Sequence, residues 1–564
     1  MGDDKASMWT PNRRELLKGS SLILAATQLG SLIPEKSVQA DTLAATAKSD
    51  STFVIAETTS GQIRGYKYGP ANYGPVNEFR GVPYGASTEG RNRFMPPRKP
   101  TGWSGVLDTL SPGPHAPQVR SASSDYVVSF NWDRLLGSMG EDCLNLNLWT
   151  PGLRDGGKRP VMVSLHGGGF GLGSGNADLF YGDSLARFGD VVVVCPNHRL
   201  NSFGFLHLAD LGAPPEFSQA GVAGMLDLVL VLRWVRDNIE NFGGDPQNVT
   251  IYGHSGGGAK TSTLMAMPDA KGLFHRAIVQ SGSALRLTDR EAATHRAETL
   301  LAKLNISKKQ IADLQTLSFA QILEASHDLG AIPPYGPVVD GKIIPNHPFD
   351  PVAPAISAHV PMIIGTSLDD AALMLVTAET GPYAANLRKG ELDDVGLKTL
   401  AHDILGEKTD AVLAAYREAY PGVSPFFILA RIQTDRGFFR HNAIIQAERK
   451  VAQKSAPVWM YRYDRPSPAY GGRFGAIHGA EVEYTFHSSR SVFSGGSGSP
   501  DAQQMAVVMA STWVAFARSG SPNNSAIPSW SPYDVVNRNT MLFNQESRQK
   551  SDPDGKLRII AQQS

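Results

Sequence analysis

The chain has 564 residues, of which 41% are hydrophobic, so it can bury a large core. Its 53 basic and 53 acidic residues balance, which argues against a nucleic-acid-binding protein with a basic surface and against an acidic protein that collects cationic partners. We find no internal repeat and no metal-ligand spacing, so we expect neither a metal nor a cofactor.

The first forty residues contain the three parts of an export signal. The stretch Asn12–Lys18, with adjacent Arg13 and Arg14, resembles the twin-arginine motif of exported bacterial proteins. The apolar stretch 19–33 is too short and too polar to span a membrane, and Val38-Gln39-Ala40 offers a small-residue cleavage site. We predict a signal peptide at 1–40, a linker at 41–51 and one folded domain at 52–564. The protein would be periplasmic or secreted after meeting the twin-arginine export machinery. A basic tail without a targeting role is the alternative.

The remaining chain alternates short apolar runs with helical segments. Residues 53–55 and 62–65 predict an antiparallel hairpin, and 222–239 predicts a helix whose apolar residues belong to the core. The regions 285–350 and 371–440 are expected to be mostly helical and inserted around the sheet. Uninterrupted apolar runs are typical of parallel strands that helices cover on both faces. Such runs occur near 161–165, 191–195, 249–252, 277–280, 361–364 and 458–463. We therefore predict an α/β fold with a central, mostly parallel sheet flanked by helices.

A glycine loop follows the first of these strands. His166 is followed by Gly167, Gly168 and Gly169, and then by Phe170. Consecutive glycines expose backbone N–H groups that no side chain shields, so such a loop can donate hydrogen bonds to an oxyanion. A flexible turn is the alternative, and the next motif weighs against it.

A nucleophile elbow is predicted at Gly253–Gly257. The serine of the pattern Gly-His-Ser-Gly-Gly, Ser255, comes directly after the apolar strand 248–252 and before a run of small residues. The G-x-S-x-G pattern between a strand and a helix places the serine at the apex of a sharp turn, above a helix N-terminus that favours developing negative charge.

A serine nucleophile needs a base and an acid that orients the base. The strand 361–366 ends in Asp369 and Asp370, and His478 lies in a loop after the strand 457–463. The order Ser255, Asp370, His478 is the chain order expected of a catalytic triad whose serine lies in a G-x-S-x-G elbow, and it favours His478 over His441 and His487. Either aspartate could instead cap a helix that starts near residue 371.

These motifs lie within a longer pattern that resembles the type-B carboxylesterases of the α/β-hydrolase fold, a family that includes bacterial para-nitrobenzyl esterases and the cholinesterases. The resemblance extends from about Thr52 to the last expected strand near Leu542, so 52–564 would form a single catalytic domain with helical insertions that wall the pocket. The matching blocks are 79–84, 93–97, 141–147, 241–246, 475–486 and 513–523.

The resemblance implies a role for each motif residue. Ser255 would be the nucleophile, His478 the general base and then acid, and Asp370 the orienting acid. The N–H groups of Gly168, Gly169 and Gly256 would form the oxyanion hole. The implied reaction is the hydrolysis of a carboxylic ester through an acyl-enzyme intermediate.

The sequence departs from the family at three places. The acid is Asp370 where the family usually has glutamate. His254 and Gly256 flank the serine in place of glutamate and alanine, and we expect His254 to be a packed, hydrogen-bonded structural residue. The family often links the cysteine at 143 to one upstream, where Ala116 stands here, so that disulfide cannot form. A disulfide-free fold agrees with folding in a reducing cytoplasm before export.

The substrate is less well defined by the sequence. The same triad could cleave an amide or a carbamate, and some relatives of the family are non-catalytic binding proteins that have lost the triad. The substrate-binding residues are unknown from sequence. Aromatic candidates for the pocket, each equally explained by packing, are Phe170, Phe180, Tyr181 and Phe217. They suggest a small ester with an apolar or aromatic group.

Overall fold

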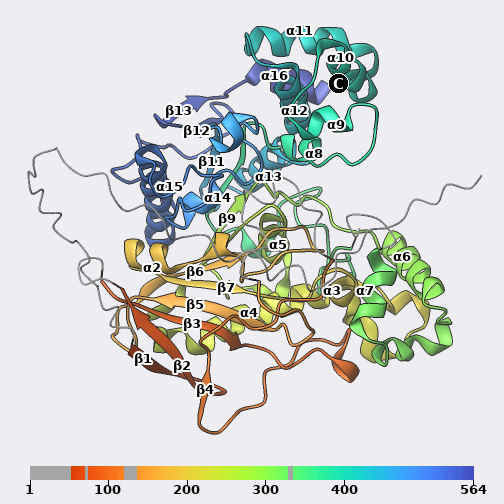
Figure 1. Cartoon of the computed structure of the whole chain (residues 1–564), viewed down its shortest axis with the longest axis vertical. Coiled ribbons are helices and arrows are strands. Elements are labelled where there is room, and N and C mark those ends of the chain that lie inside the picture. Colours follow the sequence, from red (N-terminus) through yellow and green to blue (C-terminus); the bar gives the residue numbers. More distant parts are fainter. Residues whose placement is uncertain (1–51, 70–73, 120–135, 328–334, 564) are drawn as a thin grey trace, which may run out of the picture. The chain divides into compact units, whose positions relative to one another are not determined.

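A mixed sheet of 13 strands forms the centre of the protein (Figure 1). The computed structural model describes residues 52–69, 74–119, 136–327 and 335–563. The predicted signal peptide and linker lie outside these residues. Residues Ser49–Ser564 form one compact unit, and all that follows concerns this unit.

The strands of the sheet pair in the order β1-β2-β3-β5-β7-β6-β8-β9-β10-β11-β12-β13, and β4 pairs with β2. Their bounds are β1 Thr52–Thr58, β2 Gly61–Tyr68, β3 Val76–Pro83, β4 Val106–Asp108, β5 Asn145–Thr150, β6 Arg159–Leu165, β7 Val192–Pro196, β8 Gly244–His254, β9 Arg276–Gln280, β10 Met362–Ser367, β11 Val458–Tyr463, β12 Asn539–Phe543 and β13 Arg548–Ser551. The pairs from β7 to β12 are parallel, whereas β1, β2, β3 and β5 at one edge and β13 at the other pair antiparallel.

Helices fill the connections between the parallel strands. Their bounds are α2 Asp183–Gly189, α3 Asn201–Phe205, α4 Ala223–Asn238, α5 Gly256–Ala266, α6 Arg290–Lys303, α7 Phe319–His327, α8 Ala372–Val376, α9 Ala384–Arg388, α10 Asp394–Leu405, α11 Thr409–Ala419, α12 Pro425–Arg436, α13 Arg440–Val451, α14 Val482–Thr485, α15 Pro500–Ser519 and α16 Gly555–Gln563. Helices α10, α11, α12 and α16 pack together, as Figure 1 shows.

Two hydrophobic cores lie on the two faces of the sheet. Successive strand residues point to opposite faces, and accordingly Val161 and Val163 belong to one core and Met162 to the other. The first core contains apolar side chains of α4, α5 and α13, and the second contains those of α2 and α15. Because both faces are covered, the central strands are apolar throughout, which is why they were recognisable in the sequence.

The predicted elements agree with the structure, apart from two details. The hairpin, the six central strands and the helix at 222–239 are all present, and 371–440 is mostly helical. In 285–350, by contrast, the described residues 335–350 have no regular helix. The last strand is β13 rather than the strand near Leu542. Its polar, exposed residues at the sheet edge lack the apolar signal that marks a central strand.

Among the described residues, one helical segment, Pro215–Phe242, is long and apolar enough to cross a membrane by length and composition, but 83% of its apolar window is buried inside the protein. Its apolar residues pack in the first core.

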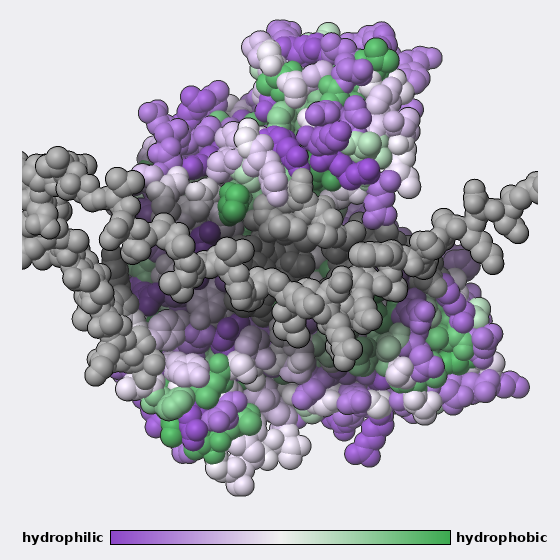
Figure 2. Space-filling view, viewed as in Figure 1, coloured by the Kyte–Doolittle hydropathy of each residue, from purple (hydrophilic) through white to green (hydrophobic). Residues whose placement is uncertain are grey.

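Over α10 and α11 the surface is largely hydrophilic, with scattered apolar residues (Figure 2).

The two cysteines of the chain, Cys143 and Cys195, are free and buried. Cys143 and Ala116 both pack in the first core, so apolar packing takes the place of the disulfide that the family often has at this position.

Candidate active site

Ser255 lies at the turn between β8 and α5. Its backbone angles are φ 58° and ψ −123°, a region that residues with a side chain rarely adopt. Its N–H donates a 2.7 Å hydrogen bond to the carbonyl of Gln280 on β9, which ties the turn to the neighbouring strand. The hydrogen bond to the sheet therefore maintains the strained conformation of Ser255. This conformation places the serine at the N-terminus of α5, as the G-x-S-x-G pattern requires.

The glycine loop lies directly against this turn. A Cβ atom on Gly256 would approach the backbone oxygen of Gly169 to 2.2 Å and its nitrogen to 2.5 Å. An alanine at 256 would thus collide with the loop, which explains physically why glycine stands there. The backbone of Gly169 and the start of α5 are brought together, as an oxyanion site between them requires.

His478 and Asp370 form a buried pair. The Nδ1 atom of His478 lies 2.7 Å from Oδ1 of Asp370, and both side chains are almost fully inaccessible. The other carboxylate oxygen of Asp370 accepts hydrogen bonds from the Ser281 hydroxyl at 2.7 Å and from the N–H of Ser367 at 3.0 Å. The carboxylate is thereby fixed in orientation, and Nδ1 carries the proton that it donates to Asp370.

Asp369 has different partners. Its Oδ1 accepts a hydrogen bond from Nε of Arg431 at 2.8 Å, and its Oδ2 accepts one from the N–H of Ala476 at 2.9 Å. The N–H of Asp369 in turn donates to the carbonyl of Ala476 at 3.0 Å. Asp369 therefore secures the loop that carries His478, and both of its carboxylate oxygens bind groups other than the imidazole.

His254 connects the two halves of the site. The ring of His254 precedes Ser255 in the chain and lies 4.2 Å, centroid to centroid, from the ring of His478. This contact places His478 beside the elbow. His254 is packed, as expected, but the expected hydrogen bonds are wrong, because neither ring nitrogen has a partner among the described residues. Burial, and next the neighbouring His478, lower the pKa of His254 well below its usual value, so His254 is neutral.

Sequence reasoning missed two polar residues around the pair. Ser281, which holds Asp370, follows β9 in the run Gln-Ser-Gly-Ser and has a positive φ of 48°. Glu481, three residues after His478, is fully buried and accepts a hydrogen bond from the Tyr461 hydroxyl at 3.1 Å. Burial, and next the charge of Asp370, raise the pKa of Glu481 to about 6. A glutamate only three residues after His478 is a feature of the sequence from which a residue near the imidazole could have been predicted.

The aromatic candidates do not form one pocket. Phe180 and Phe217 are almost fully buried in different hydrophobic cores, and the Tyr181 hydroxyl donates to Glu78 at 2.7 Å. They are packing residues. An aromatic ring that was not among these candidates, Phe439, lies beside His478, with the two ring centroids 4.9 Å apart.

Comparison with known proteins decides the family. The model of the carboxylesterase family matches residues 52–558, nearly the whole described chain. The chain belongs to the carboxylesterase family. It is therefore a serine hydrolase that cleaves carboxylic esters, with the α/β-hydrolase fold.

Relatives of this carboxylesterase match it over most of their length. Para-nitrobenzyl esterase of Bacillus subtilis (strain 168) is 32% identical over 518 residues, which cover 90% of this chain and 98% of that protein. Phenmedipham hydrolase of Pseudarthrobacter oxydans is 32% identical over 489 residues, covering 84% and 92% of the two chains. A crystal structure of a carboxylesterase from Geobacillus stearothermophilus superposes with a TM-score of 0.74 at 33% identity, covering 90% of this chain and 99% of that one.

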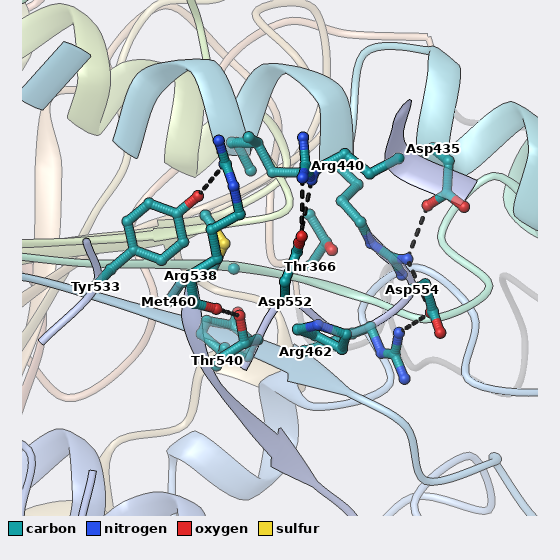
Figure 3. A pocket seen from close by; sticks show the side chains of 16 residues that line it. Thr366, Asp435, Arg440, Met460, Arg462, Tyr533, Arg538, Thr540, Asp552 and Asp554 are labelled. Atoms are coloured by element: carbon teal, nitrogen blue, oxygen red, sulfur yellow. Dashed lines mark hydrogen bonds and ion pairs between the residues drawn. The ribbon is translucent and has the colours of Figure 1, made fainter. Parts of the chain in front are cut away.

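A cavity lined by charged side chains lies between β10, β11, β12, helices α12 and α13, and residues 552–558, and Ser255 is not among the residues that line it (Figure 3). Arg440 pairs with Asp435 at 2.7 Å and Arg462 pairs with Asp554. Each of the four arginines that line the cavity pairs with a carboxylate; they are Arg440, Arg462, Arg538 and Arg558. The cluster therefore ties the C-terminal segment to the sheet, and each of its arginines already has an acidic partner. Among the described residues, no group of three or more His, Cys, Asp or Glu side chains is placed to hold a metal ion.

Proposed function

We propose that Ser255, His478 and Asp370 are the catalytic triad of this esterase, and that the N–H groups of Gly168, Gly169 and Gly256 form its oxyanion hole. The observation that carries the proposal is the combination of a strained serine at the start of α5 with a buried imidazole–carboxylate pair beside it. Strained serine turns of this kind are the structural sign of a nucleophile elbow.

In the proposed reaction, His478 takes the proton of the Ser255 hydroxyl as the oxygen attacks the ester carbonyl carbon. The resulting oxyanion accepts hydrogen bonds from the glycine N–H groups, each worth about 10²–10³ in rate. His478 then gives the proton to the leaving alcohol. Water, activated by the same imidazole, releases the acid from the acyl-enzyme. Asp370 holds the tautomer with the proton on Nδ1 and stabilises the imidazolium that forms.

The substrate class that we favour is a small ester with an apolar or aromatic group. The Phe439 ring beside His478 supports this choice, because it offers an apolar surface next to the reacting atoms. Amides and carbamates require the same triad and differ chiefly in the protonation of the leaving group. Matched aryl ester, anilide and carbamate substrates would distinguish the three, and we expect the ester to have the highest kcat/KM.

We further infer that the protein reaches the periplasm or the exterior by the twin-arginine route. The paired Arg13 and Arg14, the apolar stretch after them and the small residues before position 41 support this. Two free, buried cysteines fit a protein that folds before export, in a reducing compartment. Replacing both arginines with lysine should abolish export and leave the precursor in the cytoplasm. An unaffected mature product outside the cytoplasm would contradict the inference.

The triad is tested by Ser255→Ala, with Ser262→Ala as the matched control. Ser262 is a buried serine of α5, the helix that follows Ser255, and its hydroxyl donates to the carbonyl of Gly258 at 3.0 Å. We expect Ser255→Ala to lower kcat by about 10⁶-fold with an unchanged melting temperature, while Ser262→Ala stays within a few-fold of wild type. A Ser255→Ala protein with more than a tenth of wild-type esterase activity would refute the proposal.

A further inference from the structure

Lys260 carries a buried amino group next to the oxyanion loop. It lies on α5, five residues after Ser255, and its side chain is fully inaccessible to solvent. Its Nζ atom donates a 2.9 Å hydrogen bond to the carbonyl of His166, the residue immediately before the three glycines. Among the described residues no carboxylate forms an ion pair with Lys260. A lysine buried without a counter-ion is costly, so its presence calls for a function.

Two buried imidazoles lie near Lys260. The rings of His166, at the end of β6, and His198, after β7, stack at 4.9 Å. Each Nδ1 faces a backbone carbonyl, that of Gly167 at 2.9 Å and that of Arg199 at 2.8 Å, so each Nδ1 carries a proton. Both Nε2 atoms are buried, and neither has a hydrogen-bond partner in the part of the chain that the structure describes. Burial, and next the charge of Lys260, lower the pKa of both imidazoles, which therefore stay neutral.

The oxyanion loop is held from outside at its exit. The carbonyl of Phe170 accepts a hydrogen bond from the N–H of Asn201 at 2.8 Å. Gln118 holds both polar groups of Gly173, accepting from its N–H at 2.8 Å and donating to its carbonyl at 2.9 Å. These contacts fix the loop after the glycines.

At its entry the loop is held by Lys260. A Cβ atom on Gly257 would lie 1.9 Å from the carbonyl oxygen of Leu165 and 3.2 Å from that of His166, so α5 is pressed against the end of β6. Lys260 links α5 to the end of β6 by donating a hydrogen bond to the His166 carbonyl. Its Nζ atom also lies 5.9 Å from the ring centroid of Phe170, the residue that follows the three glycines in the chain.

We propose that Lys260 is a positioning residue of the oxyanion hole, which fixes the peptide leading into Gly168 and Gly169 through its hydrogen bond to the His166 carbonyl. This inference rests on the proposed triad and oxyanion hole. Preorganised donors in a water-excluded site act most strongly when their geometry is fixed before the reaction. Loss of Lys260 should therefore weaken binding of the transition state more than binding of the substrate.

The test compares Lys260→Met, which keeps the length and apolar packing of the side chain but removes the donor and the charge, with Lys260→Gln, which keeps an N–H donor without charge. Lys450→Met is the matched control. Lys450, on α13, is also fully buried, and its amino group donates hydrogen bonds to the backbone carbonyls of Ser357 and Ala358. The readouts are kcat and KM for p-nitrophenyl butyrate, the inhibition constant of a trifluoromethyl ketone that forms an oxyanion on serine, and the melting temperature.

For Lys260→Met we expect kcat and the affinity for the trifluoromethyl ketone to fall together by about 10- to 100-fold, with KM within about threefold of wild type and a melting temperature that is not lowered. Lys260→Gln should recover part of both losses, and Lys450→Met should leave both constants unchanged. Should Lys260→Met fail to fold, Lys260→Gln decides alone through the parallel loss of kcat and inhibitor affinity.

Wild-type-like kcat and inhibitor affinity in a folded Lys260→Met protein, or a loss of kcat without loss of inhibitor affinity, would overturn the inference. Failure of the proposed function gives a different pattern, since the wild type itself would then neither hydrolyse the ester nor bind the ketone at Ser255.

Discussion

The separate roles of the two neighbouring aspartates give a sharp test of the site. Asp370 lies 2.7 Å from Nδ1 of His478, and its carboxylate is fully buried, whereas Asp369 binds Arg431 and Ala476. In Asp370→Asn the amide cannot stabilise the imidazolium and favours the wrong tautomer of His478. We expect kcat to fall by about 10⁴-fold, which corresponds to about 5 kcal/mol of lost transition-state stabilisation.

Asp369→Asn is the matched substitution one residue away. It removes the ion pair with Arg431 but leaves an oxygen that can still accept from the N–H of Ala476. We expect a loss of about 1–3 kcal/mol in the free energy of unfolding and a kcat within tenfold of wild type.

Initial rates on p-nitrophenyl butyrate and urea unfolding of both variants provide the two measurements. The reasoning is refuted if Asp369→Asn loses the larger share of kcat, or if Asp370→Asn keeps more than a hundredth of it.

Three further predictions concern the surroundings of the triad. Ser281→Ala removes the 2.7 Å hydrogen bond to Asp370 and should lower kcat about tenfold without raising KM; steady-state kinetics check this, and an unchanged kcat contradicts it. The folded-state pKa of Glu481, about 6, exceeds its usual value of 4.5, so the stability of wild type relative to Glu481→Gln should be highest below pH 4.5 and fall by about 2 kcal/mol in all as the pH rises through 6. Burial lowers the pKa of Lys260 to about 7, so wild type should gain stability over Lys260→Met between pH 7 and pH 9 by about 1.4 kcal/mol per pH unit. Urea unfolding at several pH values measures both differences, and a difference that does not vary with pH contradicts the corresponding assignment.

Much of the fold was predictable because its signals are local. The central strands β6 to β11 are covered on both faces, which leaves continuous apolar runs in the sequence, and the elbow at Ser255 requires glycines at fixed positions. The edge strand β13 escaped prediction because its residues are polar and exposed. The expectation that 285–350 is mostly helical fails for residues 335–350, which form no regular helix.

The site was predictable only in part, because its remaining contacts are made between segments far apart in the chain. Nothing near Ser281 in the sequence indicates that its hydroxyl meets Asp370, 89 residues later. The choice between Asp369 and Asp370 depends on the direction in which each side chain leaves the end of β10. Likewise, Lys260 is an ordinary helix residue in sequence, and only its burial against the carbonyl of His166 marks it out.

The central claim is that Ser255 is an activated nucleophile, and covalent labelling tests it most directly. A fluorophosphonate probe should add one equivalent to the wild-type protein, and peptide mapping by mass spectrometry should place the adduct on Ser255. Labelling should disappear in Ser255→Ala and slow strongly in His478→Ala. A wild-type protein that stays unlabelled, or that carries the adduct on another serine, would contradict the account.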